Sequence, residues 1–213
     1  MIRIVLADDH EVVRAGFKMI LEKQADMQVV AEAAEGTQAY EIVRRTTPDI
    51  LLLDISMPPG QSGLVACEKI AHDFVQTRII ILTMFAEPEY LFYTLRGGAA
   101  GYMLKNSTSD ELVGAVRTVM SGSSYIHPKM ASILAEQLSG RGDNDTLYQQ
   151  LTSRELEILQ LIAKGYTNKE ISEMIFLSVK TIEAHRARIY QKLGLKTRAD
   201  LVAYALKHKL LDI

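Results

Sequence analysis

The sequence predicts two structural classes in one chain, a doubly wound α/β domain in the N-terminal half and an all-α domain of four helices at the C-terminal end. In the first half, short apolar runs alternate with segments of helical periodicity, which is typical of a parallel sheet covered by helices on both faces. No strand pattern occurs after about residue 148. The charge divides in the same way, because residues 1–122 carry a net charge of −5 and residues 151–213 a net charge of +4. The basic end suits a polyanionic partner.

The N-terminal domain, residues 1–121, is expected to contain five strands and five helices in alternation. The strands are short and nearly continuous apolar runs rather than alternating ones, as in a sheet that is buried on both faces. The expected strands are 2–7, 29–34, 50–53, 78–82 and 101–104, and the expected helices are 11–23, 37–45, 64–72, 87–96 and 109–120.

A linker over residues 122–147 is expected to hold one helix, 128–138, followed by a polar, glycine-containing stretch. The C-terminal domain, residues 148–213, is expected to form helices over 153–164, 168–175, 179–193 and 198–209. Thr152 or Ser153 is expected to cap the first of these helices, Gly165 to end it, and Asn168 to cap the second.

Composition excludes several classes of protein. The single cysteine, Cys67, excludes a disulfide framework within the chain. No apolar run is long enough to suggest a membrane span, and two aspartates follow the short apolar start, unlike a signal peptide. A soluble, cytoplasmic protein is therefore expected.

Acidic residues end two of the expected strands. Asp8 and Asp9 follow the first strand and Asp54 follows the third. In a flavodoxin-like sheet ordered 2-1-3-4-5 these strands are neighbours, and ligands bind at their carboxyl ends. Carboxylates this close raise one another's pKa unless a cation lies among them. Such a set suits Mg²⁺, with Asp54 as the nucleophile that forms an acyl phosphate.

Two further groups are expected at the same edge, Thr83 after the fourth strand and Lys105 after the fifth. A hydroxyl and an ammonium can bind phosphoryl oxygens. Each residue alone has a plainer interpretation: the Asp pair as a helix cap, Asp54 as a turn residue, Thr83 as structural and Lys105 as solvated. Their coincidence at four strand ends favours a site.

These strand ends resemble the receiver domain of two-component systems, in the NarL/FixJ subfamily. The resemblance covers about residues 1–121 and rests on Asp8-Asp9-His10, Leu53-Asp54 with Met57-Pro58, Leu82-Thr83 and Gly101-Tyr102-Met103-Leu104-Lys105. It implies that Asp54 accepts a phosphoryl group from a sensor histidine kinase. It also implies that Asp9, Asp54 and the backbone carbonyl of Ser56 hold Mg²⁺ with support from Asp8, and that Thr83 and Tyr102 form a switch pair whose ring turns inward.

The loop after Asp54 departs from this pattern. Gly63 lies nine residues past Asp54, whereas the family's glycine usually lies eight past it. Ser56 and Phe85 occupy the positions that flank the phosphoryl group. Phe85 either slows attack by water or packs on the next helix, and both interpretations stay open.

The long expected helix 179–193 has two different faces. Val179, Ile182, Ile189 and Leu193 share an apolar face, and Arg186 lies at its edge, where its charged end would reach solvent. The opposite face carries Lys180, Glu183, Ala184, Ala187, Arg188 and Gln191. Lys180 and Thr181 are candidates for phosphate contacts, and Arg188 for phosphate or guanine. Glu183 suits a cytosine amine, and Ala184 or Ala187 a thymine methyl group. The alternative is a helix that is merely solvated.

Residues 148–213 resemble a LuxR-type helix-turn-helix domain. The motifs are Leu151-Thr152-Ser153-Arg154-Glu155, Lys164-Gly165-Tyr166-Thr167-Asn168-Lys169-Glu170-Ile171, and Ser178 through Arg186. The resemblance implies that the helix from Val179 enters the major groove, with Thr167 and Asn168 as further contacts. It also implies a dimer formed through Leu201, Tyr204 and Ala205. Across both domains the chain looks most similar to NreC-type nitrate or oxygen regulators.

The prediction is a phosphorylation-dependent transcription regulator that binds an inverted-repeat promoter site as a homodimer. We expect no enzyme activity beyond transfer of phosphate onto Asp54. Three rivals remain: a phosphatase, which needs a carboxylate where Ser56 stands; a LuxR-type regulator that senses a ligand in a hydrophobic cavity; and a protein-interaction module.

Overall fold

A computed structural model describes residues 1–58, 60–84, 88–138, 150–208 and 210–211. The chain divides into two compact units, Met1–Glu136 and Gln137–Ile213, and each is described by itself. The predicted polar stretch after residue 138 and Phe85 lie outside the described residues.

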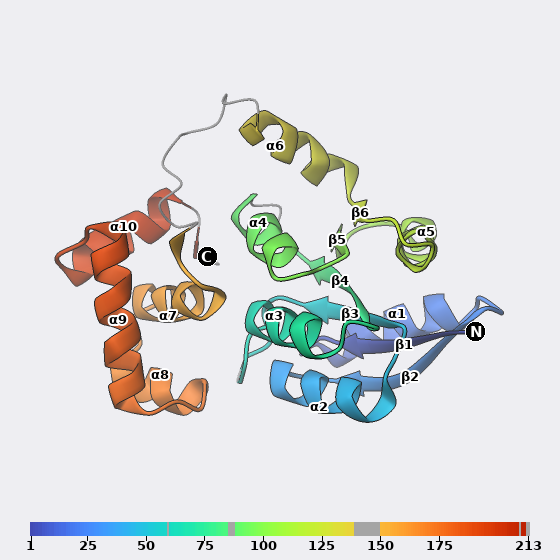
Figure 1. Cartoon of the computed structure of the whole chain (residues 1–213), viewed down its shortest axis with the longest axis horizontal. Helices are drawn as coiled ribbons and strands as arrows, with labels where there is room; N and C mark the ends of the chain where they lie inside the picture. Colours follow the sequence, from blue (N-terminus) through green and yellow to red (C-terminus); the bar gives the residue numbers. More distant parts are fainter. Residues whose placement is uncertain (59, 85–87, 139–149, 209, 212–213) are drawn as a thin grey trace. The chain divides into compact units, whose positions relative to one another are not determined.

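The first unit is built on one parallel sheet with the strand order β2-β1-β3-β4-β5-β6 (Figure 1). The predicted order 2-1-3-4-5 is therefore confirmed, with one strand added at the edge. Every pairing is parallel. The strands are β1 (Ile2–Ala7), β2 (Met27–Ala33), β3 (Ile50–Asp54), β4 (Arg78–Thr83), β5 (Gly101–Leu104) and β6 (Tyr125–Ile126).

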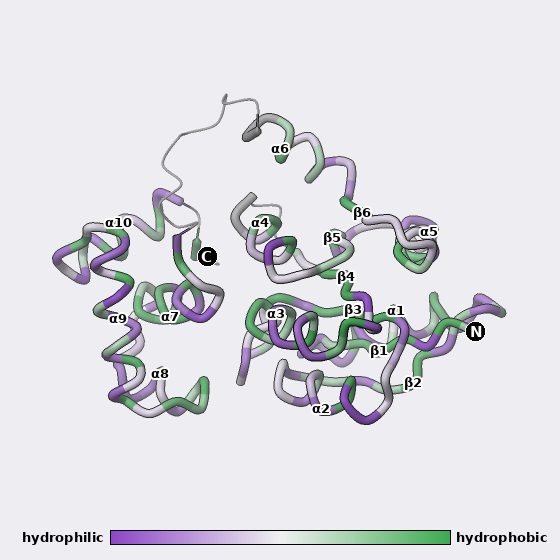
Figure 2. Tube along the Cα trace, viewed as in Figure 1, coloured by the Kyte–Doolittle hydropathy of each residue, from purple (hydrophilic) through white to green (hydrophobic). Residues whose placement is uncertain are grey.

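Helices cover both faces of this sheet, which explains why its central strand β3 is buried along its whole length (Figure 2). On one face, Leu21 of α1 and Val116 of α5 pack against Ile4, Leu52 and Leu82 of the strands. On the other face, α2, α3 and α4 lie side by side (Figure 1). These helices are α1 (Glu11–Glu22), α2 (Gly36–Thr46), α3 (Gly63–Asp73), α4 (Pro88–Arg96) and α5 (Ser109–Met120).

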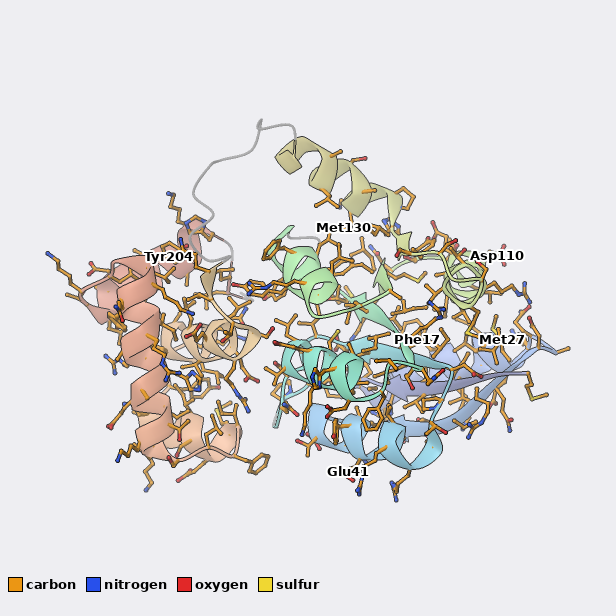
Figure 3. The ribbon with its side chains drawn as sticks, viewed as in Figure 1. Phe17, Met27, Glu41, Asp110, Met130 and Tyr204 are labelled. Atoms are coloured by element: carbon orange, nitrogen blue, oxygen red, sulfur yellow. The ribbon has the colours of Figure 1, made fainter. Side chains whose placement is uncertain are left out.

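The start of the predicted linker is part of the sheet, which the sequence analysis does not predict. Tyr125 N–H donates to the Ala100 carbonyl at 3.0 Å, and His127 N–H donates to the Tyr102 carbonyl at 2.9 Å. Helix α6 (Pro128–Leu138) follows at once, and its Met130 is fully buried (Figure 3). A strand of two residues has no periodicity by which the sequence would reveal it.

The second unit contains four helices, α7 (Ser153–Ala163), α8 (Asn168–Met174), α9 (Val179–Leu193) and α10 (Arg198–Lys207). Helix α7 contacts α9 and α10, and α8 contacts α9. The predicted C-terminal glycine of α7 is confirmed, since Gly165 follows the helix with a φ of 107°.

Two predictions for this unit are wrong in detail. The cap of α8 is Thr167 rather than Asn168. The Thr167 hydroxyl accepts a hydrogen bond from Glu170 N–H, and the Glu170 carboxylate accepts one from Thr167 N–H. Val179 is 40% exposed and does not belong to the apolar face of α9, which Ile182, Ile189 and Leu193 form.

Candidate functional site

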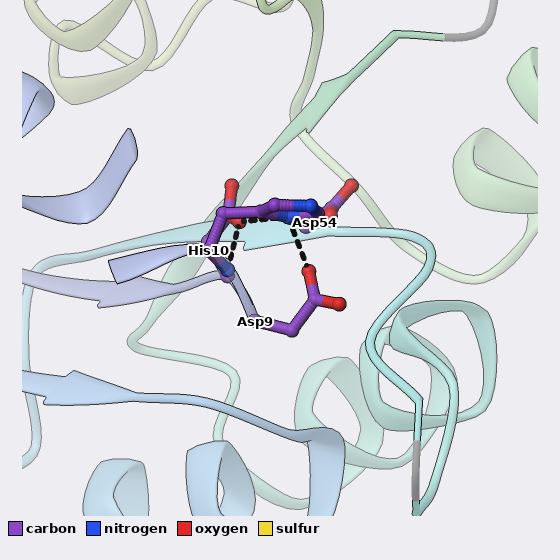
Figure 4. A group of neighbouring side chains, drawn as sticks. Asp9, His10 and Asp54 are labelled. Carbon is purple, nitrogen blue, oxygen red and sulfur yellow. Dashed lines mark hydrogen bonds and ion pairs between the residues drawn. The ribbon is translucent and has the colours of Figure 1, made fainter. Parts of the chain in front are cut away.

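Three carboxylates meet at the carboxyl ends of β1 and β3, as predicted. Asp54 is the last residue of β3, and Asp8 follows β1, its neighbour in the sheet. Asp8, Asp9, Asp54 and His10 each offer one ligand atom, and these atoms lie within 4.8 Å of one another (Figure 4). Asp8 and Asp54 are both buried, with 3% of each residue exposed.

Lys105 faces two of these carboxylates. Its Nζ lies 2.7 Å from Asp8 Oδ2 and 2.7 Å from Asp54 Oδ2. The hydrogen bond from Lys105 N to the Thr83 carbonyl, 2.8 Å long, keeps the end of β5 beside the end of β4. Lys105 thus supplies one positive charge against three carboxylates.

Burial is the largest influence on the pKa of Asp54. It raises this pKa to about 6, although the Lys105 ammonium and a hydrogen bond from Ile55 N act in the opposite direction. Burial alone would lower the pKa of Lys105, but Asp54 and Asp8 outweigh it, so that the pKa of this amine is raised. Asp54 is therefore largely ionised at neutral pH, at an energetic cost to the fold.

His10 is a member of the cluster that the sequence analysis did not single out. Its backbone N–H donates to Asp8 Oδ1 at 2.9 Å, and its Nδ1 lies 2.7 Å from Asp9 Oδ1 (Figure 4). His10 precedes α1 without a side-chain capping bond. The two aspartates thus end a strand and face the site, and the alternative in which they cap α1 is not realised.

The two predicted switch residues are fully buried, Thr83 and Tyr102 each with 0% of the residue exposed. The ring of Tyr102 thus lies inward, the position that the resemblance implies for the switched state. The Tyr102 carbonyl accepts the bond from His127 N–H, so this predicted switch residue is joined directly to the segment that leads out of the sheet.

Gly63, at the end of the loop between β3 and α3, lies against the backbone of Asp54 and Ile55. Gly63 N–H donates to the Ile55 carbonyl at 2.8 Å, and a Cβ at Gly63 would lie 1.7 Å from the Asp54 carbonyl oxygen. The loop also touches the start of α2, where Gly36 N–H donates to the Gln61 carbonyl at 3.1 Å. Ser56 is half-buried in this loop, and the role of its carbonyl stays a prediction.

The cluster fits a divalent cation. Asp8, Asp9 and Asp54 bring three carboxylates against one ammonium, which leaves negative charge to be balanced. Asp9 Oδ1 receives no well-aligned hydrogen bond from the described residues. Carboxylate oxygens are the ligands that a hard cation such as Mg²⁺ prefers.

The C-terminal unit presents the predicted polar face of α9 to solvent. Lys180, Glu183, Ala184, Ala187 and Arg188 are exposed. Two predicted contacts are engaged within the protein: the Thr181 hydroxyl lies 2.7 Å from that of Ser178, and the Thr167 hydroxyl bonds Glu170. Asn168 is half-buried at the start of α8.

The predicted dimer residues do not form a surface. Leu201 and Ala205 have no exposed area, and Tyr204 has 9%. Their apolar side chains are buried in the core of the domain, so they stabilise α10 rather than offer it to a partner. The exposed large apolar residue of α10 is Leu206, with 48% of its area exposed.

Comparison with known proteins agrees with this geometry. Residues 4–117 match the response regulator receiver domain, and residues 149–205 match the bacterial regulatory proteins of the luxR family. The oxygen regulatory protein NreC of Staphylococcus aureus is 54% identical over 99% of both chains. No helix in the described ranges has the length and apolar character that crossing a membrane requires.

The chain is also similar to solved structures of response regulators. A LuxR-family two-component response regulator from Aurantimonas is 36% identical with a TM-score of 0.62, over 65% of this chain and 99% of that one. RcsB of Salmonella enterica, bound to the promoter rprA with the phosphomimetic BeF₃⁻, is 27% identical with a TM-score of 0.69, over 95% and 97% of the two chains. The chain therefore belongs to the two-component response regulators that join a receiver to a LuxR-type DNA-binding domain, and it is a phosphorylation-dependent regulator of transcription.

Proposed function

We propose that Asp54 is the phosphoacceptor and that a sensor histidine kinase is the donor. A carboxylate oxygen of Asp54 attacks the phosphorus, the bond from phosphorus to the donor's imidazole nitrogen breaks, and an acyl phosphate forms. The observation that supports this most directly is the contact of 2.7 Å between Lys105 Nζ and Asp54 Oδ2 in a buried site. Lys105 would stabilise the negative charge of the transferring group.

We further propose that Asp8, Asp9 and Asp54, with the backbone carbonyl of Ser56, hold Mg²⁺. When bound, this ion would neutralise the carboxylates and the phosphoryl oxygens. Asp8 also orients Lys105, which lies between Asp8 and Asp54. Thr83, at the end of β4, would bind a phosphoryl oxygen through its hydroxyl and couple it to Tyr102.

The chemistry is transfer onto the protein's own Asp54 and not turnover of a substrate, so we propose a regulator rather than an enzyme. A phosphatase with an aspartyl nucleophile needs an acid/base carboxylate two residues further on, and Ser56 occupies that position. The acidic strand edge likewise supports a phosphoryl site over a hydrophobic ligand cavity. We expect the regulator to act in the cytoplasm.

For the second domain we propose that α9 enters the major groove of an inverted-repeat promoter site and that phosphorylation favours a homodimer on it. The exposed polar face of α9 supports this. The solved structures of RcsB bound to promoters include the phosphomimetic BeF₃⁻. The name of the S. aureus relative suggests oxygen as the class of input signal.

The acceptor is tested by incubating the chain with acetyl phosphate and MgCl₂ and measuring intact mass. We expect one added phosphoryl group on the wild-type chain and none on Asp54→Asn or in excess EDTA. A phosphoryl group on Asp54→Asn would contradict the assignment of the acceptor, and unchanged labelling in EDTA would contradict the metal site.

A further inference from the structure

A groove runs along one edge of α9, between this helix, the start of α8 and the turn that follows α9. It measures about 380 Å³ and is open to solvent. Its lining residues are Asn168, Glu183, Arg186, Ala187, Tyr190 and Lys196. Two of these side chains are cationic and one is acidic, so the groove carries excess positive charge.

The groove lies beside the face that α9 is proposed to turn toward DNA. At 3.6 residues per turn, Ala187 lies near the middle of that face, with Arg186 and Tyr190 toward one edge and Arg188 toward the other. A helix in the major groove has a phosphate backbone along each of its two edges. With α9 in the major groove, the pocket beside Arg186 and Tyr190 would face one backbone, and Arg188 would face the other.

Neighbouring groups contact the Arg186 side chain and the backbone of Lys196. The guanidinium carbon of Arg186 lies 5.4 Å from the centroid of the Tyr190 ring, a distance at which the ring attracts the cation. Lys196 stands in a turn fixed by Asp200, whose carboxylate accepts from Lys196 N at 3.1 Å and from Thr197 N at 2.7 Å.

We infer that this groove binds a phosphodiester group of the DNA backbone through Arg186 and Lys196. The inference rests on the proposed DNA-binding function and adds to it a contact outside the predicted face. Arg186 was expected only to reach solvent from the apolar edge of α9, and Lys196 belonged to no predicted site. Because phosphate contacts carry no base information, this contact adds affinity on every sequence.

Tyr190 is a positioning residue in this arrangement. Its hydroxyl is buried and has no hydrogen-bond partner among the described residues, so its ring is the part that acts, by holding Arg186. Phenylalanine at this position is expected to replace it fully, and leucine is not.

The test is the salt dependence of DNA binding by the full chain, measured by fluorescence anisotropy on two unrelated 30-base-pair duplexes between about 50 and 200 mM KCl. Arg186→Gln and Lys196→Gln are each expected to reduce the log–log slope by about 0.9, the value for one lost phosphate contact, on both duplexes. Tyr190→Leu is expected to behave like Arg186→Gln, and Tyr190→Phe like the wild type.

Lys207→Gln serves as the matched control, since it removes one exposed charge of α10 outside the groove lining; thermal melting checks the fold of each variant. Wild-type slopes for folded Arg186→Gln and Lys196→Gln would overturn the inference and leave the proposed function intact. A loss confined to one duplex would also overturn it, because it would indicate a base contact. No binding by the wild-type chain would overturn the proposed function together with the inference.

Discussion

At the residue scale, Asp54 is a carboxylate whose surroundings oppose its charge. Its pKa of about 6 lies above that of the same group in the unfolded chain. The folded state therefore binds the proton more tightly, and the metal-free chain loses stability as the pH rises from about 4 through about 6. Above that range the ionised Asp54 lowers the free energy of unfolding.

Replacing this charge should stabilise the metal-free protein. In EDTA at pH 7.5, Asp54→Asn is expected to raise the free energy of unfolding by on the order of 1–3 kcal/mol. Lys105→Met is the opposite change, since it leaves the carboxylates without their ammonium, and it is expected to lower that free energy. Urea denaturation measures both. A destabilised Asp54→Asn protein would show that burial does not dominate this site.

Gly63 gives a second test at this scale. A Cβ there would collide with the Asp54 carbonyl, so Gly63→Ala is expected to cost more than about 2 kcal/mol of stability and to slow phosphorylation of Asp54. Gly114→Ala is the control, because Gly114 is exposed within α5 with no atom close to the new methyl group. It is expected to gain about 0.5–1 kcal/mol. Equal effects of the two changes in chemical denaturation would refute the steric explanation.

The candidate site was largely predictable because its residues end strands. Asp8, Asp54 and Thr83 each follow an apolar run, and the parallel order of the strands brings such positions together. His10 was not predictable in this way, since its role depends on the turn into α1. The reach of the Lys105 side chain to both aspartates is likewise a property of the folded site.

At the element scale, α7 and α9 are joined by a partly buried ion pair, in which Glu155 is buried and Lys192 is half-buried. Lys192 Nζ lies 2.6 Å from Glu155 Oε2, and the same carboxylate accepts from Thr152 N at 2.8 Å in the capping box of α7. Burial alone would raise the pKa of Glu155, but these bonds outweigh it, so that its pKa is lowered. The stabilisation is thus present above pH 4.5 and is lost as the pH falls below that value.

Glu155→Gln is accordingly expected to destabilise the C-terminal domain by about 1–3 kcal/mol at pH 7. The difference from the wild type should shrink as the pH falls below 4.5. Glu170→Gln is matched to it, because Glu170 holds the same capping position in α8 but is exposed, and its effect should be smaller. Melting curves from pH 3 to pH 7 give the comparison; a constant difference across this range would argue against the ion pair as the cause.

The ends of elements were the least predictable. Helix α2 ends at Thr46, and its C-cap residue Thr47 has a φ of 41°, a conformation in which glycine is usual. No glycine marks this end in the sequence, so the local signal is missing. The burial of the predicted dimer residues was not predictable for a related reason: the sequence shows that Leu201, Tyr204 and Ala205 are apolar, but only packing shows that they are buried within the domain.

At the scale of the whole molecule, the receiver sheet extends into the segment that leads to the second domain. Strand β6 pairs with β5 at Tyr102, and α6 is anchored by the buried Met130. Tyr102 is therefore in backbone contact with the segment that leads toward the DNA-binding domain. A shift of Thr83 and Tyr102 on phosphorylation of Asp54 would act directly on this segment. This continuity gives phosphorylation a physical route to that domain.

The most direct test of the account is DNA binding by the full chain before and after incubation with acetyl phosphate and Mg²⁺, measured by gel shift on the promoter of a regulated gene. We expect phosphorylation to strengthen binding by the wild-type chain and to leave binding by Asp54→Asn unchanged. Equal strengthening of the wild type and Asp54→Asn would contradict it.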